Sequence, residues 1–500
     1  MKILYRVVTL LSCLILFSAS LLAGGFENIN IGLKATAMGS AYRALADDWT
    51  AAYYNPAAYA LINDNQLGGN AAFGHYRQTL VPNFRRTSNT DSFESGFFND
   101  REMYNAHKIL SNPSGGIVLR LPVWGETVFG FSIYQPFDYN TNWTLFRPLA
   151  AYNTANAIPN DQYSTDLDVV SFQISAGREF KEEKLYLGLG LQLLRADLVW
   201  SELKFRDNPM PAPFDDRPYD MIPEWTHSEG HGWGFGIKGG LLWTPTDRIN
   251  LGISGNIPFD ITISGDSSML NFYLPKVGND GGFSIGTIEH LFASGSRING
   301  LADFETKLKL PPSFGIGLSF DITSKLTMAI DAQYMLWSQF DGFQFSYSNF
   351  AGLSGLVDTS ILVQAITDST NDTTNVSDWV YESTSHPVVW ENSGRVMLGA
   401  RYNPSNLLSL FAGGYADQSP ARKATQFTPN FVDTGDKYNY SGGFIFHINE
   451  WDIGLATSYT SYPDLQINRI DSDGDGIDDA IPGLYQADYY ETVLSFIYRF

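Results

Sequence analysis

Four aspartates in the C-terminal part of the chain could bind a metal ion. In the stretch DSDGDGIDD, Asp471, Asp473 and Asp475 alternate along the chain, and Asp479 follows four residues later. Carboxylates that alternate around a glycine turn can surround a hard cation with oxygen ligands. An EF-hand would need Glu at its twelfth position, where this chain has Pro482. The stretch therefore predicts either a calcium-stabilised loop, in which the ion braces the loop, or a solvated acidic loop.

Two further patterns could support catalysis, but neither has the required spacing. HSEGH places Glu229 between His227 and His231, which differs from the HExxH order of zinc proteases, and the neighbouring glycines disfavour the helix that this motif needs. Serines are plentiful, yet no G-x-S-x-G elbow occurs with an assignable histidine partner. The sequence predicts no enzyme activity, although a triad spread over strands would escape this search.

The composition favours a β-rich protein that does not bind nucleic acid. The chain has 500 residues, with 53 Asp and Glu against 32 Lys and Arg, so its formal net charge is −21. A phosphate-binding surface needs an excess of basic residues, which this chain lacks. Aromatic residues make up 14% of the chain and there are 46 glycines, whereas charged residues make up 17%. This balance fits strands with small residues on one face and does not fit a disordered acidic chain.

The first 23 residues have the organisation of a secretory signal peptide. Lys2 and Arg6 precede an apolar run that ends near Leu22, and small residues close the segment. We assign residues 1–23 to this signal, with a membrane anchor as the alternative. Cys13, the only cysteine, lies within it, so no disulfide is expected in the mature protein. No later apolar run is long enough to predict a spanning helix, so an exported membrane protein would have to cross with strands.

Alternating stretches predict such strands. In LYLGLGLQL (185–193), leucines occupy one face, while the other face carries Tyr, Gly and Gln. SFGIGLSF (313–320) and WGFGIKGGL (233–241) repeat this pattern. A transmembrane barrel has segments of about ten residues with apolar side chains towards lipid and small or polar side chains towards the lumen.

The spacing of turns and loops predicts the number of strands. Six short turns each join two predicted strands, and they lie near residues 123–126, 181–184, 244–248, 321–325, 403–406 and 447–450. One more strand near 66–78 and another at 490–500 bring the total to about fourteen. Long segments such as 258–311 and 338–393 read as loops. We therefore predict an all-β fold, an antiparallel transmembrane β-barrel of about 14 strands with short periplasmic turns and long extracellular loops, spanning residues 66–500.

The C-terminal sequence ETVLSFIYRF reads as the last strand of this barrel. Phe496, Tyr498 and Phe500 share one face and are expected to meet lipid at the membrane interface, where aromatic side chains gather. A closed barrel pairs its last strand with its first, whereas a soluble β-protein would leave an edge strand. The barrel predicts outer-membrane lipid as a partner, and also the barrel assembly machinery, acting through the C-terminal strand.

Residues 24–65 do not alternate and precede the first strand. They are rich in Ala and Gly, with Met38, Tyr42 and Leu45 at helical spacing, and Pro56 ends the preceding helix. A small, partly helical segment of this kind can plug the lumen of a fourteen-stranded barrel. We predict that residues 24–65 form such a hatch.

This segment carries a family resemblance. GLKATAMGSAYRALADDWTAAYYNPAAYA resembles the N-terminal hatch of the FadL/TodX outer-membrane transport family, including the tripeptide Asn55, Pro56 and Ala57. LPPSFGIGLSFDITSKLTMAIDAQYMLWSQF (310–340) and GGYADQSPARKATQFTPNFVDTGDKYNYSGGFIF (413–446) are similar to later strand pairs of that family. The resemblance implies a barrel closed by a hatch, which passes long-chain fatty acids or other hydrophobic molecules. By the same resemblance, Phe26 and Ile29 would line a ligand pocket, and the ligand would leave sideways through a kinked strand.

The resemblance leaves more than one function open. The first reading is an outer-membrane channel of a bacterial cell that takes up hydrophobic molecules past the hatch. The alternative is a barrel of the same family that docks proteins during secretion, similar to the shuttle proteins of type IX secretion. An open porin is disfavoured by the predicted hatch. Apart from calcium in the 471–479 loop, no cofactor is expected.

Overall fold

The computed structural model describes most of the chain. The described residues are 25–83, 98, 100–106, 109–121, 127–147, 158–180, 184–207, 221–273, 297–351, 384–421, 430, 435–468 and 481–500. Among them, no helix is long and apolar enough to cross a membrane. The proposed signal peptide and the four aspartates at 471–479 lie outside the described residues.

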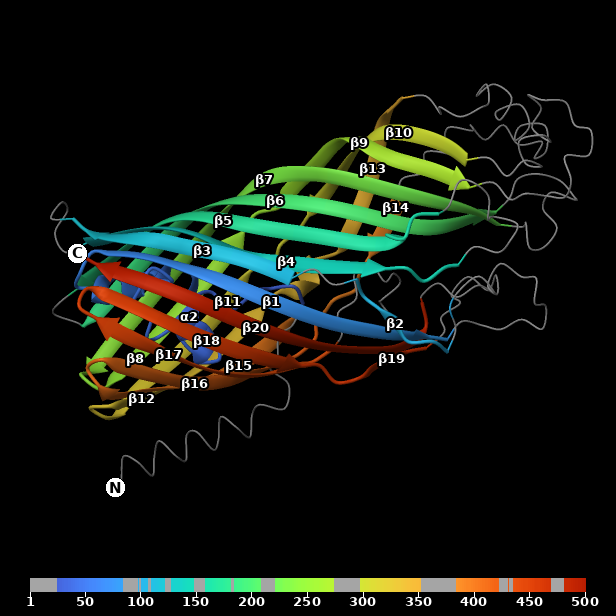
Figure 1. Ribbon diagram of the computed structural model, residues 1–500. Helices are drawn as coiled ribbons and strands as arrows, with labels where there is room; N and C mark the ends of the chain where they lie inside the picture. The colour runs from blue at the N-terminus through green and yellow to red at the C-terminus, as the bar shows by residue number, and fades with distance from the viewer. Residues whose placement is uncertain are drawn as a thin grey trace, which may run out of the picture.

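Fourteen antiparallel strands form a closed barrel (Figure 1), which confirms the predicted fold class. In the order in which they pair, they are β1 (Gln66–Pro82), β3 (Ile109–Arg120), β4 (Thr127–Trp143), β5 (Tyr163–Phe180), β6 (Leu185–Asp207), β7 (Met221–Thr246), β8 (Ile249–Pro258), β11 (Ser313–Thr323), β12 (Leu326–Met335), β15 (Ser393–Ser405), β16 (Leu408–Asp417), β17 (Lys437–Ile448), β18 (Trp451–Ser461) and β20 (Gly483–Arg499). The barrel closes where β20 pairs with β1, from Arg499 opposite Gln66 to Gly483 opposite Pro82.

The outer surface of the barrel is apolar, as the alternation predicted. Along β6, Leu187, Leu189 and Leu191 are exposed, whereas Gln192, on the opposite face of the strand, is buried. The C-terminal strand follows the same rule, with Phe496 exposed on the outside. Exposing so many apolar side chains to water would be unfavourable in free energy, so these side chains face the hydrocarbon of the bilayer.

The strands are longer than predicted, and the long loops are correspondingly shorter. β6 has 23 residues, although about 9–11 residues suffice to cross a bilayer. Among the described residues, six further strands extend the wall at the end opposite the C-terminus (Figure 1): β2 (Met103–Tyr104), β9 (Ile261–Tyr273), β10 (Arg297–Leu308), β13 (Gly342–Ala351), β14 (Thr384–Pro387) and β19 (Leu465–Ile467). The prediction that 258–311 and 338–393 are simple loops is therefore wrong. Strands that extend beyond the bilayer do not need apolar outward faces, so they lack the signal by which membrane-spanning strands are found.

The N-terminal segment, residues 25–65, lies within the barrel. Its helices are α2 (Leu33–Ala37), α3 (Ala51–Tyr54) and the 3-10 helix η1 (Pro56–Leu61), and α2 is visible between the strands in Figure 1. Most of its side chains are buried in one hydrophobic cluster with lumen-facing residues of the wall, such as Val118 and Ala456. Packing against the wall stabilises these helices, because isolated helices of four to six residues are unstable in water.

Candidate functional site

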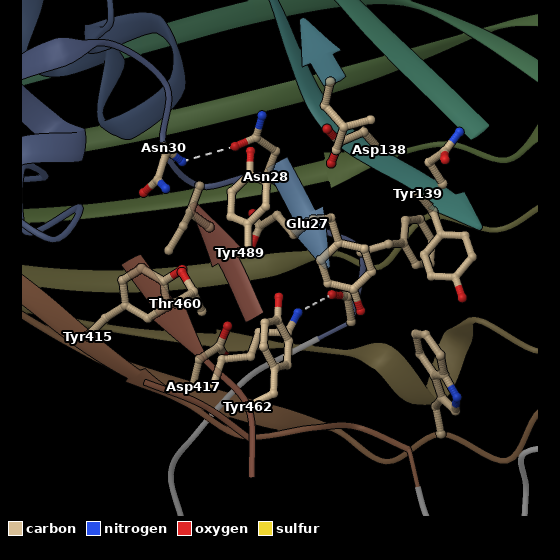
Figure 2. A pocket seen from close by; sticks show the side chains of 18 residues that line it. Glu27, Asn28, Asn30, Asp138, Tyr139, Tyr415, Asp417, Thr460, Tyr462 and Tyr489 are labelled. Carbon is tan, nitrogen blue, oxygen red and sulfur yellow. Dashed lines mark hydrogen bonds between the residues drawn. The ribbon is translucent and has the colours of Figure 1, made fainter. Parts of the chain in front are cut away.

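A cavity of about 130 Å³ lies at the start of the N-terminal segment. Residues 25–30 form one side of it, and strands from both ends of the chain form the rest (Figure 2). Its lining is rich in tyrosine and also contains charged and amide side chains: Glu27, Asn28, Asn30, Tyr76, Asp138, Tyr139, Asn140, Tyr415, Asp417, Lys437, Tyr462 and Tyr489. The cavity thus combines aromatic surface with a small number of polar groups, as ligand pockets commonly do.

The predicted ligand-binding residues, Phe26 and Ile29, both line this cavity. The ring of Phe26 is surrounded by aromatic rings, with centroids 5.0 Å away for Trp337, 5.2 Å for Phe340 and 6.0 Å for Trp390. Only 4% of Phe26 is exposed. The structure brings these residues to the cavity, while ligand binding by them stays a prediction.

The barrel wall is interrupted beside the cavity. β3 and β4 pair only from Arg120 opposite Val128 to Gly115 opposite Ile133. Farther out, β3 remains paired with β1 and β4 with β5, but among the described residues of these two strands no ladder joins 109–114 to 134–143. An irregularity in β4 between Tyr134 and Phe137 accompanies the separation.

The N-terminal segment occupies the edge of β4 from which β3 has separated. The backbone N–H of Asn28 donates to the carbonyl of Pro136 at 2.9 Å, and the N–H of Asp138 donates to the carbonyl of Phe26 at 3.2 Å. Glu27 forms an antiparallel bridge with Phe137. Because β5 holds the other edge of β4, residues 26–28 act as a short additional strand at the interruption.

Two cations hold this short strand from the opposite wall. Nη1 of Arg395 donates to Glu27 at 2.9 Å, and its Nη2 donates to Asp417 at 2.8 Å. Lys437 donates to the carbonyl oxygen of Gly25. Sequence reasoning did not single out any of these charged residues, because none of them belongs to a recognisable motif and their proximity depends on the closure of the barrel.

Asn55, Pro56 and Ala57 anchor the N-terminal segment to the strands on the far side of the lumen. The side chain of Asn55 accepts the N–H of Ala57 at 3.1 Å and donates to the carbonyl of Leu241 on β7 at 3.1 Å. The segment approaches β6 and β7 so closely that a Cβ at Gly188 would lie 2.1 Å from the Ala57 nitrogen. The tripeptide therefore links a helix start to the wall, at a contact that requires glycine in the wall.

A second anchor of the N-terminal segment lies towards the rim of the barrel at which the C-terminus is found. Arg401 of β15 binds Asp47 at 3.0 Å, and Lys34 contacts both Asp47 and Asp48. Burial alone would raise the pKa of Asp47, but the Lys34 ammonium and the Arg401 guanidinium outweigh it and hold this pKa well below its usual range. Burial would lower the pKa of Lys34, but the two carboxylates raise it above its usual value. The side chains of Asp47 and Lys34 are therefore charged at neutral pH.

One histidine cluster has the Ser–His–Asp contacts of a hydrolytic triad but lacks an oxyanion hole. His447 contacts Ser409 at 2.8 Å through Nε2 and Asp452 at 2.6 Å through Nδ1. Ser409 lies within β16, opposite Ile445 of β17, so neighbouring backbone N–H groups serve the sheet and do not form an oxyanion hole. We interpret this row as a polar link between adjacent strands.

The HSEGH stretch lies on β7, which agrees with the prediction that it is not helical. His227 contacts Ser201 at 2.7 Å and Glu229 at 3.1 Å. The described part of the chain contains no group of three His, Cys, Asp or Glu residues arranged to hold a metal ion. The calcium prediction for Asp471, Asp473, Asp475 and Asp479 stays a prediction, since these residues lie outside that part.

Solved structures share this barrel. A FadL homologue from Pseudomonas aeruginosa is 18% identical, covers 96% of this chain and is itself covered to 99%, with a TM-score of 0.67. The toluene transporter TodX of Pseudomonas putida is 14% identical, with coverages of 95% and 99% and a TM-score of 0.62. At these identities the similarity concerns the fold.

Sequence comparison agrees with the structural one. The outer membrane protein NMB0088 of Neisseria meningitidis is 22% identical over 442 residues, which are 87% of this chain and 84% of that protein. The family model of outer membrane protein transport proteins (OMPP1/FadL/TodX) matches residues 14–500. The chain therefore belongs to the family of outer membrane protein transport proteins (OMPP1/FadL/TodX).

Proposed function

We propose that this protein takes up long-chain fatty acids or similar amphipathic apolar molecules through the outer membrane. The observation that carries the proposal is a ligand-sized cavity located at an interruption of the barrel wall. An apolar molecule gains free energy in a pocket lined by aromatic rings and in the bilayer, but not in a water-filled lumen. A cavity beside an interrupted wall serves such a molecule better than a continuous aqueous pore would.

The N-terminal segment supplies the barrier of this proposed channel. Residues 25–65 act as the hatch, because they fill the lumen and are anchored at Asn55 and Asp47. A hatch that remained rigid would block every solute. The route we propose therefore avoids its centre and passes from the cavity sideways between β3 and β4.

The size of the cavity limits what it can hold at rest. A cavity of about 150 Å³ accommodates benzene, so the present 130 Å³ has room for one ring or for the head group and first carbons of a chain. A longer molecule needs residues 26–29 to move away from β4. Lys437 lines the cavity and supports a carboxylate head group, while the rings around Phe26 support an apolar tail.

Relatives support the apolar class of ligand. TodX and its homologue from Ralstonia pickettii are toluene transporters. We also propose that outer-membrane lipid surrounds the barrel and that the barrel assembly machinery recognises its C-terminal strand, since Leu494 and Phe496 of β20 and the terminal residue Phe500 are exposed.

The proposal is tested by identifying what the protein carries. Protein extracted from outer membranes in mild detergent is analysed by mass spectrometry for small molecules, and we expect enrichment of long-chain fatty acids or hydrocarbons over a porin control. Exchange of Phe26 for Asp should abolish the enrichment. A stoichiometric secreted protein without enriched apolar molecules would instead favour the protein-docking alternative. Large, steady ion currents in planar bilayers would contradict a closed hatch.

A further inference from the structure

Glu27 holds an anion-binding position at the edge of the cavity. Its carboxylate accepts hydrogen bonds from Arg395 at 2.9 Å, from the hydroxyl of Tyr53 at 2.8 Å and from Gln333 at 3.2 Å. The side chain is 6% exposed, so nearly all of its contacts are with protein. The donors come from the N-terminal segment, β12 and β15. They converge on one carboxylate, and this is the arrangement that a bound acid would require.

Arg395 is built to receive carboxylates. Its side chain is only 1% exposed, and its two terminal nitrogens bind Glu27 and Asp417 separately. Both of these acids line the cavity, so Arg395 lies directly behind the cavity wall. A planar guanidinium forms strong, directional hydrogen bonds with carboxylates, and a buried guanidinium without such a partner is costly. Movement of Glu27 would leave Nη1 of Arg395 without its carboxylate, while Asp417 remains on Nη2, so the vacated position favours another anion.

The carboxylates around the cavity already outnumber the cations. Three carboxylates, those of Glu27, Asp138 and Asp417, are opposed by two cations, Arg395 and Lys437. A ligand carboxylate added to this set would increase the excess of negative charge in a poorly hydrated site. A ligand carboxylate that replaces Glu27 would leave the charge of the site unchanged.

We infer that Glu27 is an internal surrogate for the carboxylate of the ligand, and that an acid entering the cavity displaces it from Arg395. This inference rests on the proposed uptake of amphipathic acids. Glu27 is also the residue whose backbone bridges Phe137 on β4. Release of its side chain removes one of the side-chain restraints on residues 26–28, so that these residues can leave β4 and widen the interruption. Binding of the acid and opening of the wall are thus one exchange reaction.

The exchange predicts a difference between acids and neutral molecules. The full-length protein in detergent is tested for binding of laurate and of 1-dodecanol, which share a chain length but differ in charge, by equilibrium dialysis. In Glu27→Gln the internal competitor has lost its charge, so laurate should bind about tenfold more tightly, the effect of one charge-assisted hydrogen bond. Dodecanol should bind as it does to the native protein.

The matched control is Glu491→Gln. Glu491 is another buried carboxylate of the lumen, and it accepts a hydrogen bond from Asn30 at 2.8 Å. Its neutralisation tests whether any loss of negative charge in the lumen strengthens laurate binding. A second variant, Arg395→Lys, keeps the charge but loses the two-pronged geometry, and should reduce the preference for laurate over dodecanol.

Each outcome decides between the exchange and a simpler role. The exchange is supported if Glu27→Gln binds laurate more tightly than the native protein does, binds dodecanol equally well, and if Glu491→Gln shows no gain for laurate. Equal gains for laurate and dodecanol would mean that Glu27 only fills space, and equal gains in Glu491→Gln would mean a general electrostatic effect; both overturn the exchange and leave the channel function intact. If the native protein binds neither molecule, the proposed ligand class fails and the exchange fails with it.

Discussion

A single methyl group on β7 should release the N-terminal segment from the wall. Gly240 faces Asn55, and a Cβ added at Gly240 would lie 2.0 Å from the Asn55 Oδ1 atom. Its neighbour Gly239 points outwards, and a Cβ there meets nothing within 4 Å. Gly240→Ala and Gly239→Ala are therefore the same chemical change, made one residue apart on opposite faces of the same strand.

The magnitude follows from what Asn55 would lose. An extra methyl group in a packed site costs about 1–3 kcal/mol. If Asn55 moves away instead, its side-chain bonds to Leu241, Arg43 and Ala57 break, at 3.1, 3.2 and 3.1 Å in the structure, and each is worth about 1 kcal/mol. The first route costs about 1–3 kcal/mol and the second about 3 kcal/mol, which raises the population with a detached segment about 5- to 150-fold.

Planar-bilayer recordings measure this population directly, because a detached segment opens an aqueous path. We expect brief openings of Gly240→Ala to be at least about fivefold more frequent than those of the native protein, while Gly239→Ala stays at the native level. Limited proteolysis within residues 25–65 should rise in parallel. Equal opening frequencies in the two variants would refute the reasoning, since the two residues differ only in what their Cβ atoms meet.

Three further predictions concern other parts of the molecule. The pKa of Asp47 is lowered in the folded state, so its stabilising effect is present above about pH 4 and is lost as the pH falls below it; the pKa of Lys34 is raised, so its effect is lost as the pH rises above about 10.5. Thermal unfolding followed by tryptophan fluorescence should show a stability plateau between these limits. Phe26→Ala removes a buried ring from an aromatic cluster and should weaken binding of an apolar ligand at least tenfold in equilibrium dialysis. Ser409 should not react with a fluorophosphonate probe, because its strand offers no oxyanion hole.

Each of these has its own control. In Asp47→Asn the acid limb of the stability profile should become shallower, and an unchanged limb would show that other carboxylates set it. A Phe26→Leu variant separates loss of aromatic contact from loss of volume; if it weakens binding as much as Phe26→Ala, the ring itself matters. Labelling of the native protein but not of Ser409→Ala would contradict the absence of hydrolytic chemistry.

The membrane-spanning strands could be predicted because lipid imposes a pattern on sequence. Every second residue of β6 and β11 must be apolar to face hydrocarbon, so their periodicity is visible without a structure. β9 and β13 are not subject to this constraint, and they lie within the predicted loops 258–311 and 338–393. The stretch ITISG at the start of β9 does alternate, with Ile261 and Ile263 buried, and this was the available signal.

The sequence by itself determined the exported β-barrel, its strand number, the closure of β20 on β1 and the separate N-terminal segment, because each of these depends on local periodicity, turns or composition. Only the tertiary structure decided the site. Glu27 lies hundreds of residues before Arg395 and Lys437 in the chain. The three residues come together only because the barrel closes around the segment that carries Glu27. The interruption between β3 and β4 is likewise a property of pairing between strands. No local pattern records which strand edges remain unpaired, so sequence alone could not locate it.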